Sequence, residues 1–123
     1  MNDTPCVSVI MPCRNEARYI EPVLAAILSM KEPPGGFEVI VADGMSDDDT
    51  FERVIKIASQ DSRIRCIENP GRIVSTGLNT AIREARGEII IRLDAHTEYA
   101  PDYITRCLAT LVSSGADLSL IHI

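Results

Sequence analysis

The sequence predicts an α/β fold, a doubly wound and mainly parallel sheet with helices on both faces. Short apolar runs rich in Val and Ile alternate along the chain with segments whose apolar residues recur at helical spacing. This alternation is typical of βαβ units. Polar residues directly follow each apolar run. Because right-handed crossovers bring the carboxyl ends of parallel strands to one edge of the sheet, these polar residues are expected to meet there.

Four segments are expected to be strands, namely residues 7–12, 37–42, 63–67 and 88–93. The first, second and fourth are near-continuous apolar runs, which are typical of parallel strands covered on both faces. These three segments are therefore expected to be the interior of the sheet.

The first two helices are expected over residues 19–30 and 49–60, where apolar side chains recur at helical spacing. Pro22 is compatible with the first helix only if it lies in the first turn. Asp47 or Asp48 is the expected N-cap of the second helix.

Two further helices are expected later in the chain. Residues 75–85 carry the third, and Gly87 is expected to end it as a C-cap residue. A fourth begins after Pro101, a residue suited to a first helical turn. The Pro- and Gly-rich residues 31–36 are interpreted as a turn, not as a domain linker.

Composition limits the class of protein. The chain has 123 residues, which fits one domain or part of one, and 46% of them are hydrophobic, which is enough for a sizeable core. The net charge of −6 does not favour a broad nucleic-acid surface, which needs clustered Lys and Arg. No nucleic-acid partner is therefore expected.

The sequence predicts a cytoplasmic location. The first residues lack the basic and apolar segments of a secretory signal, and no apolar run approaches the roughly 20 residues that span a bilayer. The cysteines are widely separated and lack Cys-x-x-Cys spacing, so they are interpreted as reduced, mostly buried thiols: Cys6, Cys13, Cys66 and Cys107.

The polar clusters after the four strands form a site hypothesis. They comprise residues 12–16, 43–50, 68–72 and 94–96. One such cluster is ordinary loop chemistry, but four at the ligand-binding edge of a parallel sheet indicate a binding site.

The cluster Asp94-Ala95-His96 suits a divalent cation and a diphosphate. Carboxylate and imidazole both bind Mn²⁺, and carboxylate also suits Mg²⁺. His96 also has a purely structural interpretation as a hydrogen-bonded loop histidine. The proximity of Asp94 favours the ligand interpretation.

The other candidates have structural interpretations too. Asp43 suits a turn as well as a nucleotide contact. Glu16 suits the first turn of a helix, and residues 47–49 are interpreted as helix-capping carboxylates in preference to metal ligands. Arg14 can equally be a solvated surface residue, and for Arg72 the surface interpretation is favoured over a phosphate contact.

The chain resembles glycosyltransferase family 2, with its GT-A fold, in the stretches VSVIMPCRNE, VIVADGMSDDDT, Asn-Pro-Gly-Arg and GEIIIRLDAHTEYAPDY. These have the family's order and spacing and cover about residues 7–115. They are most similar to bacterial exopolysaccharide transferases of the succinoglycan type, in which Asp-Ala-His replaces the commoner Asp-x-Asp. The resemblance implies an inverting transfer of a sugar from a nucleotide-sugar donor, with a UDP-sugar favoured. It also implies a glycan or lipid-linked hydroxyl acceptor in polysaccharide or cell-envelope glycan synthesis.

The resemblance assigns a nucleotide-binding role to five residues. Pro12, Arg14 and Glu16 fall where the family holds the base and ribose. Asp43 matches the carboxylate that accepts a hydrogen bond from the base, typically from uracil N3–H, a role that suits an acceptor-only group. Arg72 falls near a segment that often contacts phosphate or base.

The resemblance also implies a metal, Mn²⁺ or Mg²⁺. Asp94 matches the first aspartate of the family motif, near the ribose and diphosphate, and His96 stands at the metal-ligand position. The metal would act as a Lewis acid on the leaving diphosphate. The catalytic base of inverting members lies further downstream, so none is assigned in this chain.

Two departures from the family pattern matter. The family often has Arg before Asn in the helix after the third strand, and here Leu78 precedes Asn79. A diphosphate contact is therefore missing or supplied elsewhere. Residues 118–123 also fit the family poorly. We therefore interpret residues 1–117 as the N-terminal nucleotide-sugar-binding part of a truncated glycosyltransferase domain, followed by a tail of foreign origin.

Three other function classes are compatible with parts of this pattern. A non-catalytic nucleotide-binding α/β domain would share every motif. A nucleotidyltransferase would need a Gly-rich loop after the first strand, and an oxidoreductase of Rossmann type would need Gly-x-Gly-x-x-Gly. Neither pattern is found in the sequence. For the full-length parent, a lipid-linked acceptor would place the enzyme at the cytoplasmic face of a membrane.

Overall fold

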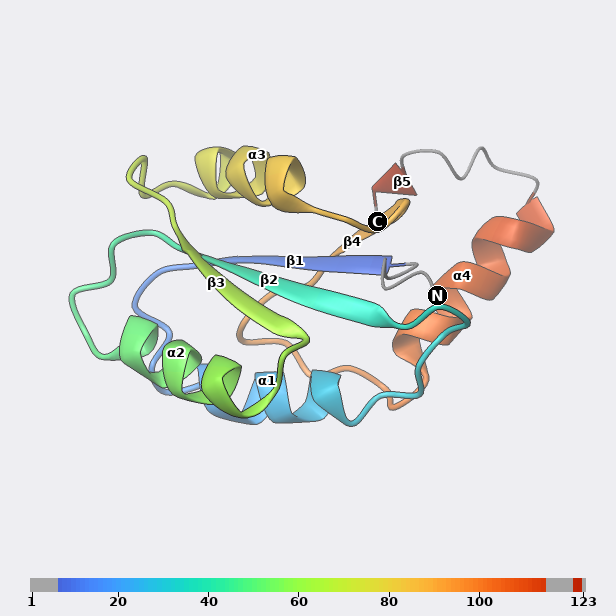
Figure 1. Cartoon of the computed structure of the whole chain (residues 1–123), viewed down its shortest axis with the longest axis horizontal. Helices are drawn as coiled ribbons and strands as arrows, with labels where there is room; N and C mark the ends of the chain where they lie inside the picture. The colour runs from blue at the N-terminus through green and yellow to red at the C-terminus, as the bar shows by residue number, and fades with distance from the viewer. Residues whose placement is uncertain (1–6, 115–120, 123) are drawn as a thin grey trace.

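The computed structural model describes residues 7–114 and 121–122. Strands and helices alternate along the chain as expected (Figure 1). The strands are β1 (Val7–Cys13), β2 (Phe37–Asp43), β3 (Ile64–Glu68), β4 (Ile89–Arg92) and the short β5 (Ile121–His122). The helices are α1 (Ile20–Leu28), α2 (Thr50–Gln60), α3 (Val74–Glu84) and α4 (Tyr103–Ser114). The expected domain boundary after residue 117, and most of the tail that follows it, lie outside the described residues.

The strands form one sheet in the order β3-β2-β1-β4-β5, and every pairing is parallel. The chain moves outward from β1 through β2 to β3 and then crosses to the other side of β1 to form β4, so a switch point lies between β1 and β4. Helices α1 and α2 lie on one face of the sheet and α3 on the other (Figure 1). The predicted doubly wound sheet is confirmed, and ligands of such sheets bind beyond the strand ends near the switch point.

Two apolar cores hold these layers together. Alternate strand residues such as Val9, Met11 and Val39 pack in the larger core with residues of α1, α2 and α4. The residues between them, such as Ile10 and Ile40, pack against α3 in a smaller core. Both faces of the central strands are therefore buried, which explains why their sequences are almost continuously apolar.

A hydrogen-bonded group lies at the amino ends of the strands, on the α3 side. It consists of Ser8, Glu38 and Arg65 with the backbone N–H groups of Arg86 and Gly87, and we call it the amino-end network. Glu38 accepts hydrogen bonds from the Ser8 hydroxyl at 2.6 Å, from the Arg86 N–H at 2.7 Å and from the Arg65 guanidinium at 2.9 Å. Burial alone would raise the pKa of Glu38, but these hydrogen bonds hold the pKa below its ordinary value.

Two local predictions about helix ends are wrong. The N-cap of α2 is Asp49, not Asp47 or Asp48. The side chain of Asp48 nevertheless accepts a hydrogen bond from the Thr50 N–H at 3.0 Å, so the helix start is satisfied from one residue further away. Helix α3 ends with Ala85 as its C-cap, before Gly87.

Gly87 is needed for a different reason. A β-carbon on it would lie 2.7 Å from the backbone nitrogen of Ser8, too close for any side chain. This close approach lets the Gly87 N–H donate to the Ser8 hydroxyl at 2.8 Å, so the glycine joins the α3–β4 connection to β1.

The positions of Pro22 and the cysteines can be compared with those expected from the sequence. Pro22 lies in the first turn of α1, as required. The described cysteines, Cys13, Cys66 and Cys107, are free thiols but only half-buried. Within residues 7–114 and 121–122, no helix has both the length and the apolar character to cross a membrane.

Candidate functional site

A cavity of about 230 Å³ opens beyond the carboxyl ends of β1, β3 and β4. It lies at the edge of the sheet next to the switch point, where ligands of doubly wound sheets bind. Six of the seven residues that the sequence singles out line this cavity: Pro12, Arg14, Glu16, Arg72, Asp94 and His96. Residues that lie up to 84 positions apart in the chain are therefore brought together here.

The loop after β1 is joined to the loop after β2 by a series of hydrogen bonds. Asn15, in a left-handed conformation with φ of 55°, accepts from the Asp47 N–H at 2.7 Å. Its own N–H donates to the Ser46 hydroxyl at 2.9 Å. Arg14 donates to the Gly44 carbonyl at 2.9 Å and to Asp47 at 3.1 Å. The Arg14 guanidinium is therefore already engaged in holding the two loops together.

The seventh predicted residue, Asp43, does not line the cavity. It is 2% exposed, and its carboxylate accepts hydrogen bonds from the Ser46 N–H at 3.1 Å and from the Ser46 hydroxyl. The structure thus places Asp43 in the turn chemistry that was its alternative interpretation. Its contact with a base stays a prediction.

The β3–α3 connection closes one side of the cavity. Arg72 has a left-handed φ of 67° and donates its N–H to the Asn69 carbonyl at 3.0 Å. A β-carbon on Gly44 would lie 2.9 Å from the Arg72 carbonyl oxygen. The β2 loop therefore needs glycine at this position so that the Arg72 turn can lie over it and contribute to the cavity wall.

Asn69 lies in the same wall and is 2% exposed. Its Nδ2 donates to the Ile73 carbonyl at 2.9 Å, which holds the start of α3. Its Oδ1 is buried and has no hydrogen-bond partner. Buried polar groups without partners are rare in proteins.

The other side of the cavity is the end of β4. The Asp94 N–H donates to the Tyr99 hydroxyl at 2.8 Å, which fixes the backbone at this point. The Asp94 carboxylate lies 3.4 Å from the Arg92 guanidinium. Nδ1 of His96 lies 3.5 Å from a Glu16 oxygen, so the β4 end faces the loop after β1 across the cavity.

The donor set at the β4 end suits a divalent cation that arrives with its substrate. Within the described ranges, no three His, Cys, Asp or Glu side chains converge on one point. Asp94 and His96 offer one carboxylate and one imidazole, and Mn²⁺ accepts both. Metal ions at nucleotide sites commonly take one or two protein ligands, with substrate phosphates and water as the others. The residues present therefore fit a metal of this kind.

Cys13 lines the cavity but is not a suitable nucleophile. Burial raises the pKa of its thiol well above the usual range, and the charge of Asp43 adds to this effect. The reactive form of cysteine is the thiolate, so Cys13 is inert packing in the cavity wall.

Six lining residues were not predicted as site residues: Cys13, Asn69, Ile73, Val74, Arg92 and Ala95. Ile73 and Val74 are 60% and 49% exposed, which is unusual for aliphatic side chains beside a polar cavity. Their signal in the sequence was an aliphatic pair directly after a polar turn. Arg92 was visible as the one charge that ends the apolar run of β4.

A parallel α/β sheet with a polar cavity at the strand ends places the chain in the class of doubly wound α/β domains that bind ligands at a switch point. Within that class the chain belongs to glycosyl transferase family 2, whose family model matches residues 8–123.

Sequence relatives agree with this assignment. The succinoglycan biosynthesis protein ExoA of Rhizobium meliloti is 36% identical over 111 residues, which cover 89% of this chain and 33% of the relative. Glycosyltransferase AglD of Haloferax volcanii is 38% identical over 100 residues, which cover 78% of this chain and 16% of the relative. The chain thus spans a third or less of the length of these two proteins.

Solved structures show the same fold. The mannosyltransferase PcManGT from Pyrobaculum calidifontis, in complex with GDP-Man and Mn²⁺, is 34% identical with a TM-score of 0.80, over 87% of this chain and 32% of that one. TarS of S. aureus, in complex with UDP-GlcNAc, is 22% identical with a TM-score of 0.70, over 87% of this chain and 31% of that one. The GT-A type of fold that the sequence resemblance implied is confirmed.

Proposed function

We propose that this chain is the donor-binding part of an inverting glycosyltransferase. The parent enzyme transfers a sugar from a nucleotide-sugar donor, with a UDP-sugar favoured, to a hydroxyl of a glycan or lipid-linked acceptor in polysaccharide synthesis. One observation carries the proposal: six residues predicted to bind the donor or its metal line a single cavity at the switch point of the sheet. With a lipid-linked acceptor, the parent works at the cytoplasmic face of a membrane.

The donor is proposed to lie across the strand ends, with its base toward β3 and its diphosphate toward β4. Pro12 and Arg72 line the part of the cavity near the base, and Arg14 holds the loop between them. Asp94 and His96 lie at the diphosphate end. Since β3 and β4 are three inter-strand spacings apart, roughly 14 Å, the two ends of a nucleoside diphosphate reach different strands.

Asp94 and His96 are proposed to hold Mn²⁺ or Mg²⁺. Support comes from the donor chemistry of the pair and from the Mn²⁺ in the mannosyltransferase complex. When bound, the metal neutralises negative charge on the leaving diphosphate. The Tyr99 hydroxyl, which accepts from the Asp94 N–H, keeps the aspartate backbone in place for this role.

Transfer also requires a base that removes the proton of the acceptor hydroxyl. No residue of this chain is assigned to that role. The 123-residue chain is therefore proposed to bind the donor nucleotide and to transfer little or no sugar.

Calorimetric titration of the 123-residue chain with UDP and with GDP, each with Mn²⁺ and with EDTA, tests the proposal. We expect UDP to bind in a metal-dependent way, and Asp94→Ala and His96→Ala to abolish that dependence. Asp102→Ala is the matched control, because Asp102 is an exposed aspartate outside the cavity wall. Equal binding by the wild type and both site variants, or no binding of either nucleotide by the wild type, would overturn the proposal.

A further inference from the structure

Arg92 is a cavity residue to which no role has been given. It is the last residue of β4, its side chain is 39% exposed, and it lines the cavity two residues before Asp94. We propose that Arg92 binds the diphosphate of the donor, an inference that rests on the proposed function and identifies the cation of that site.

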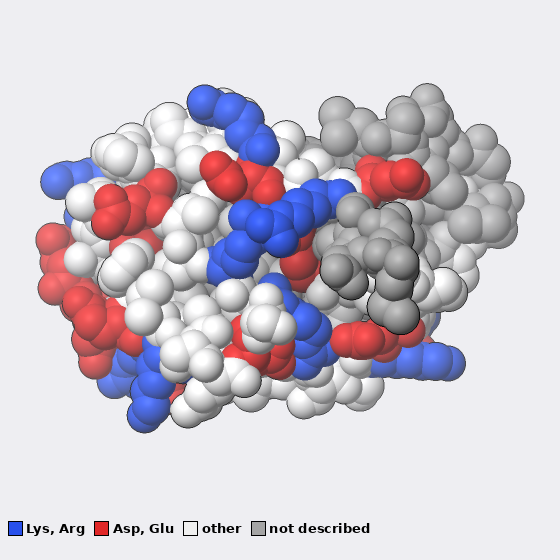
Figure 2. All heavy atoms as spheres, in the orientation of Figure 1, with Lys and Arg blue, Asp and Glu red and all other residues white. Residues whose placement is uncertain are grey.

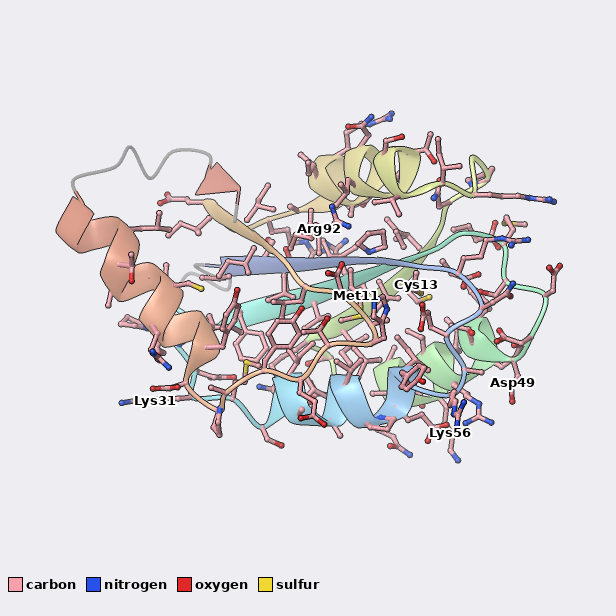
Figure 3. The ribbon with its side chains drawn as sticks, turned by 180° about the vertical axis from the view of Figure 1, so that it is seen from behind. Met11, Cys13, Lys31, Asp49, Lys56 and Arg92 are labelled. Atoms are coloured by element: carbon pink, nitrogen blue, oxygen red, sulfur yellow. The ribbon has the colours of Figure 1, made fainter. Side chains whose placement is uncertain are left out.

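The sheet register explains why Arg92 faces the cavity from the α3 side. Arg92 pairs with Ile10 on β1, and it lies two residues after Ile90, so its side chain leaves the same face of the sheet as Ile90. Ile10 and Ile90 both belong to the apolar core under α3. Figure 3 shows Arg92 between the sheet and α3, where this core gives way to the cavity.

Three arginines line the cavity, and they are not equally available. Arg14 is engaged by the Gly44 carbonyl and Asp47. Arg72 lies on the far side, after β3. Arg92 contacts one acceptor among the described residues, Asp94, and at 3.4 Å this contact is long for a charged hydrogen bond. A metal that takes the Asp94 carboxylate would leave Arg92 beside the diphosphate with all its donors free.

Arg92 can also supply the positive charge that α3 lacks at Leu78. Leu78, where the family often has Arg, packs against the apolar core that contains Ile10 and Ile90. Arg92 continues the row of Ile90 on the opposite side of that core. A cation on β4 can therefore contact the phosphates in place of one on the helix, and a guanidinium suits phosphate oxygens because its donors form a planar fork.

A comparison of UDP with UMP tests this role, because the two ligands differ only in the second phosphate. Both are titrated calorimetrically into the wild type, Arg92→Met and Arg83→Met in Mn²⁺ buffer. We expect Arg92→Met to weaken UDP binding by about ten- to a hundredfold and UMP binding far less, so that the UDP/UMP affinity ratio collapses. Arg83→Met, the same substitution at an exposed arginine of α3 outside the cavity wall, is the control and is expected to keep the wild-type ratio.

An unchanged UDP/UMP ratio in Arg92→Met would overturn the inference and leave the proposed function standing. No binding of UDP by the wild type would overturn both. If circular dichroism shows that Arg92→Met is unfolded, Arg92→Gln, which keeps a polar side chain without the charge, is measured in its place. A retained ratio in that variant counts against the role of Arg92, and a collapsed ratio counts for it.

Discussion

The two ends of the sheet differ in the burial and hydrogen bonding of their polar side chains. At the amino ends of the strands, Glu38 is 6% exposed and accepts hydrogen bonds from three different segments. At the carboxyl ends, Arg92 and Asp94 are 39% and 46% exposed and contact each other at 3.4 Å. At the amino end the carboxylate of Glu38 has its hydrogen-bond partners within the protein, although Nε of Arg65 beside it is buried without one. At the carboxyl end, Arg92 and Asp94 keep much of their hydrogen-bonding capacity open to the cavity.

The difference separates folding from binding. Satisfied buried polar groups stabilise one arrangement of the segments that hold them. Groups that keep free donors and acceptors in a concave site can exchange water for a ligand. Figure 2 shows basic and acidic side chains interspersed over this face of the molecule. The cavity wall also carries both signs, with three arginines and the carboxylates Glu16 and Asp94, so the cavity is distinguished by how its charges are paired.

The largest expected effect on stability is at the amino end. Glu38→Ala removes the acceptor of three hydrogen bonds and leaves the Arg86 N–H without its partner, so we expect the free energy of unfolding to fall by about 2–4 kcal/mol. Urea denaturation followed by circular dichroism measures this change. Asp94→Ala at the carboxyl end is expected to change the free energy of unfolding by less than about 0.5 kcal/mol.

The control for this pair is Glu84→Ala, which removes a half-exposed carboxylate that also contacts Arg65. A small effect in this control would tie the loss to the buried acceptor and not to Arg65. If Asp94→Ala destabilised the chain as much as Glu38→Ala, the division between the two ends would be wrong.

A smaller effect is expected from Gly87→Ala. The added β-carbon would lie 2.7 Å from backbone atoms of Val7 and Ser8, and backbone gives way less readily than a side chain. We expect a loss of about 1–3 kcal/mol in the free energy of unfolding. Arg86→Ala keeps the backbone N–H bond to Glu38 and should be nearly neutral. A neutral Gly87→Ala would mean that the α3–β4 connection can move without cost.

The sequence was sufficient to predict β1 to β4, the four helices and the parallel sheet, because Val- and Ile-rich runs such as residues 37–42 have few alternatives to a buried parallel strand. It did not predict the short β5, which pairs with β4. It was also sufficient to place six cavity residues at one edge, since strand direction alone determines where those residues go. It did not predict the amino-end network, because Ser8, Glu38 and Arg65 are far apart in the chain and show no motif.

Single-residue geometry also escaped prediction. Glycine suits a helix C-cap, so the sequence predicts that role for Gly87, but in the structure Gly87 is needed because a β-carbon there would clash with β1. The N-cap of α2 is Asp49, not Asp47 or Asp48. The three successive aspartates have the same capping chemistry, so the sequence alone does not determine which of them caps the helix. The sequence did not predict Arg92 as a site residue, because a charged residue at the end of an apolar run is also an ordinary way to end a strand.

The smallest expected effect is on the pH dependence of stability at acidic pH. The hydrogen bonds to Glu38 hold its pKa below the ordinary value of 4.5, so the folded chain binds the proton less readily than the unfolded one. Glu38 therefore contributes stability that is fully present above about pH 4.5 and is lost as the pH falls through its folded pKa.

Asp48 and Asp61 have lowered pKa values too, so the pH dependence of wild-type stability alone cannot isolate the contribution of Glu38. Urea denaturation of the wild type and Glu38→Gln between pH 7 and pH 3 can do so. The difference between them should shrink toward acid, by less than about 1.4 kcal/mol per pH unit, the limit for one proton. A difference that stays constant over this range would show that the charge of Glu38 adds nothing to the hydrogen bonds that the amide keeps.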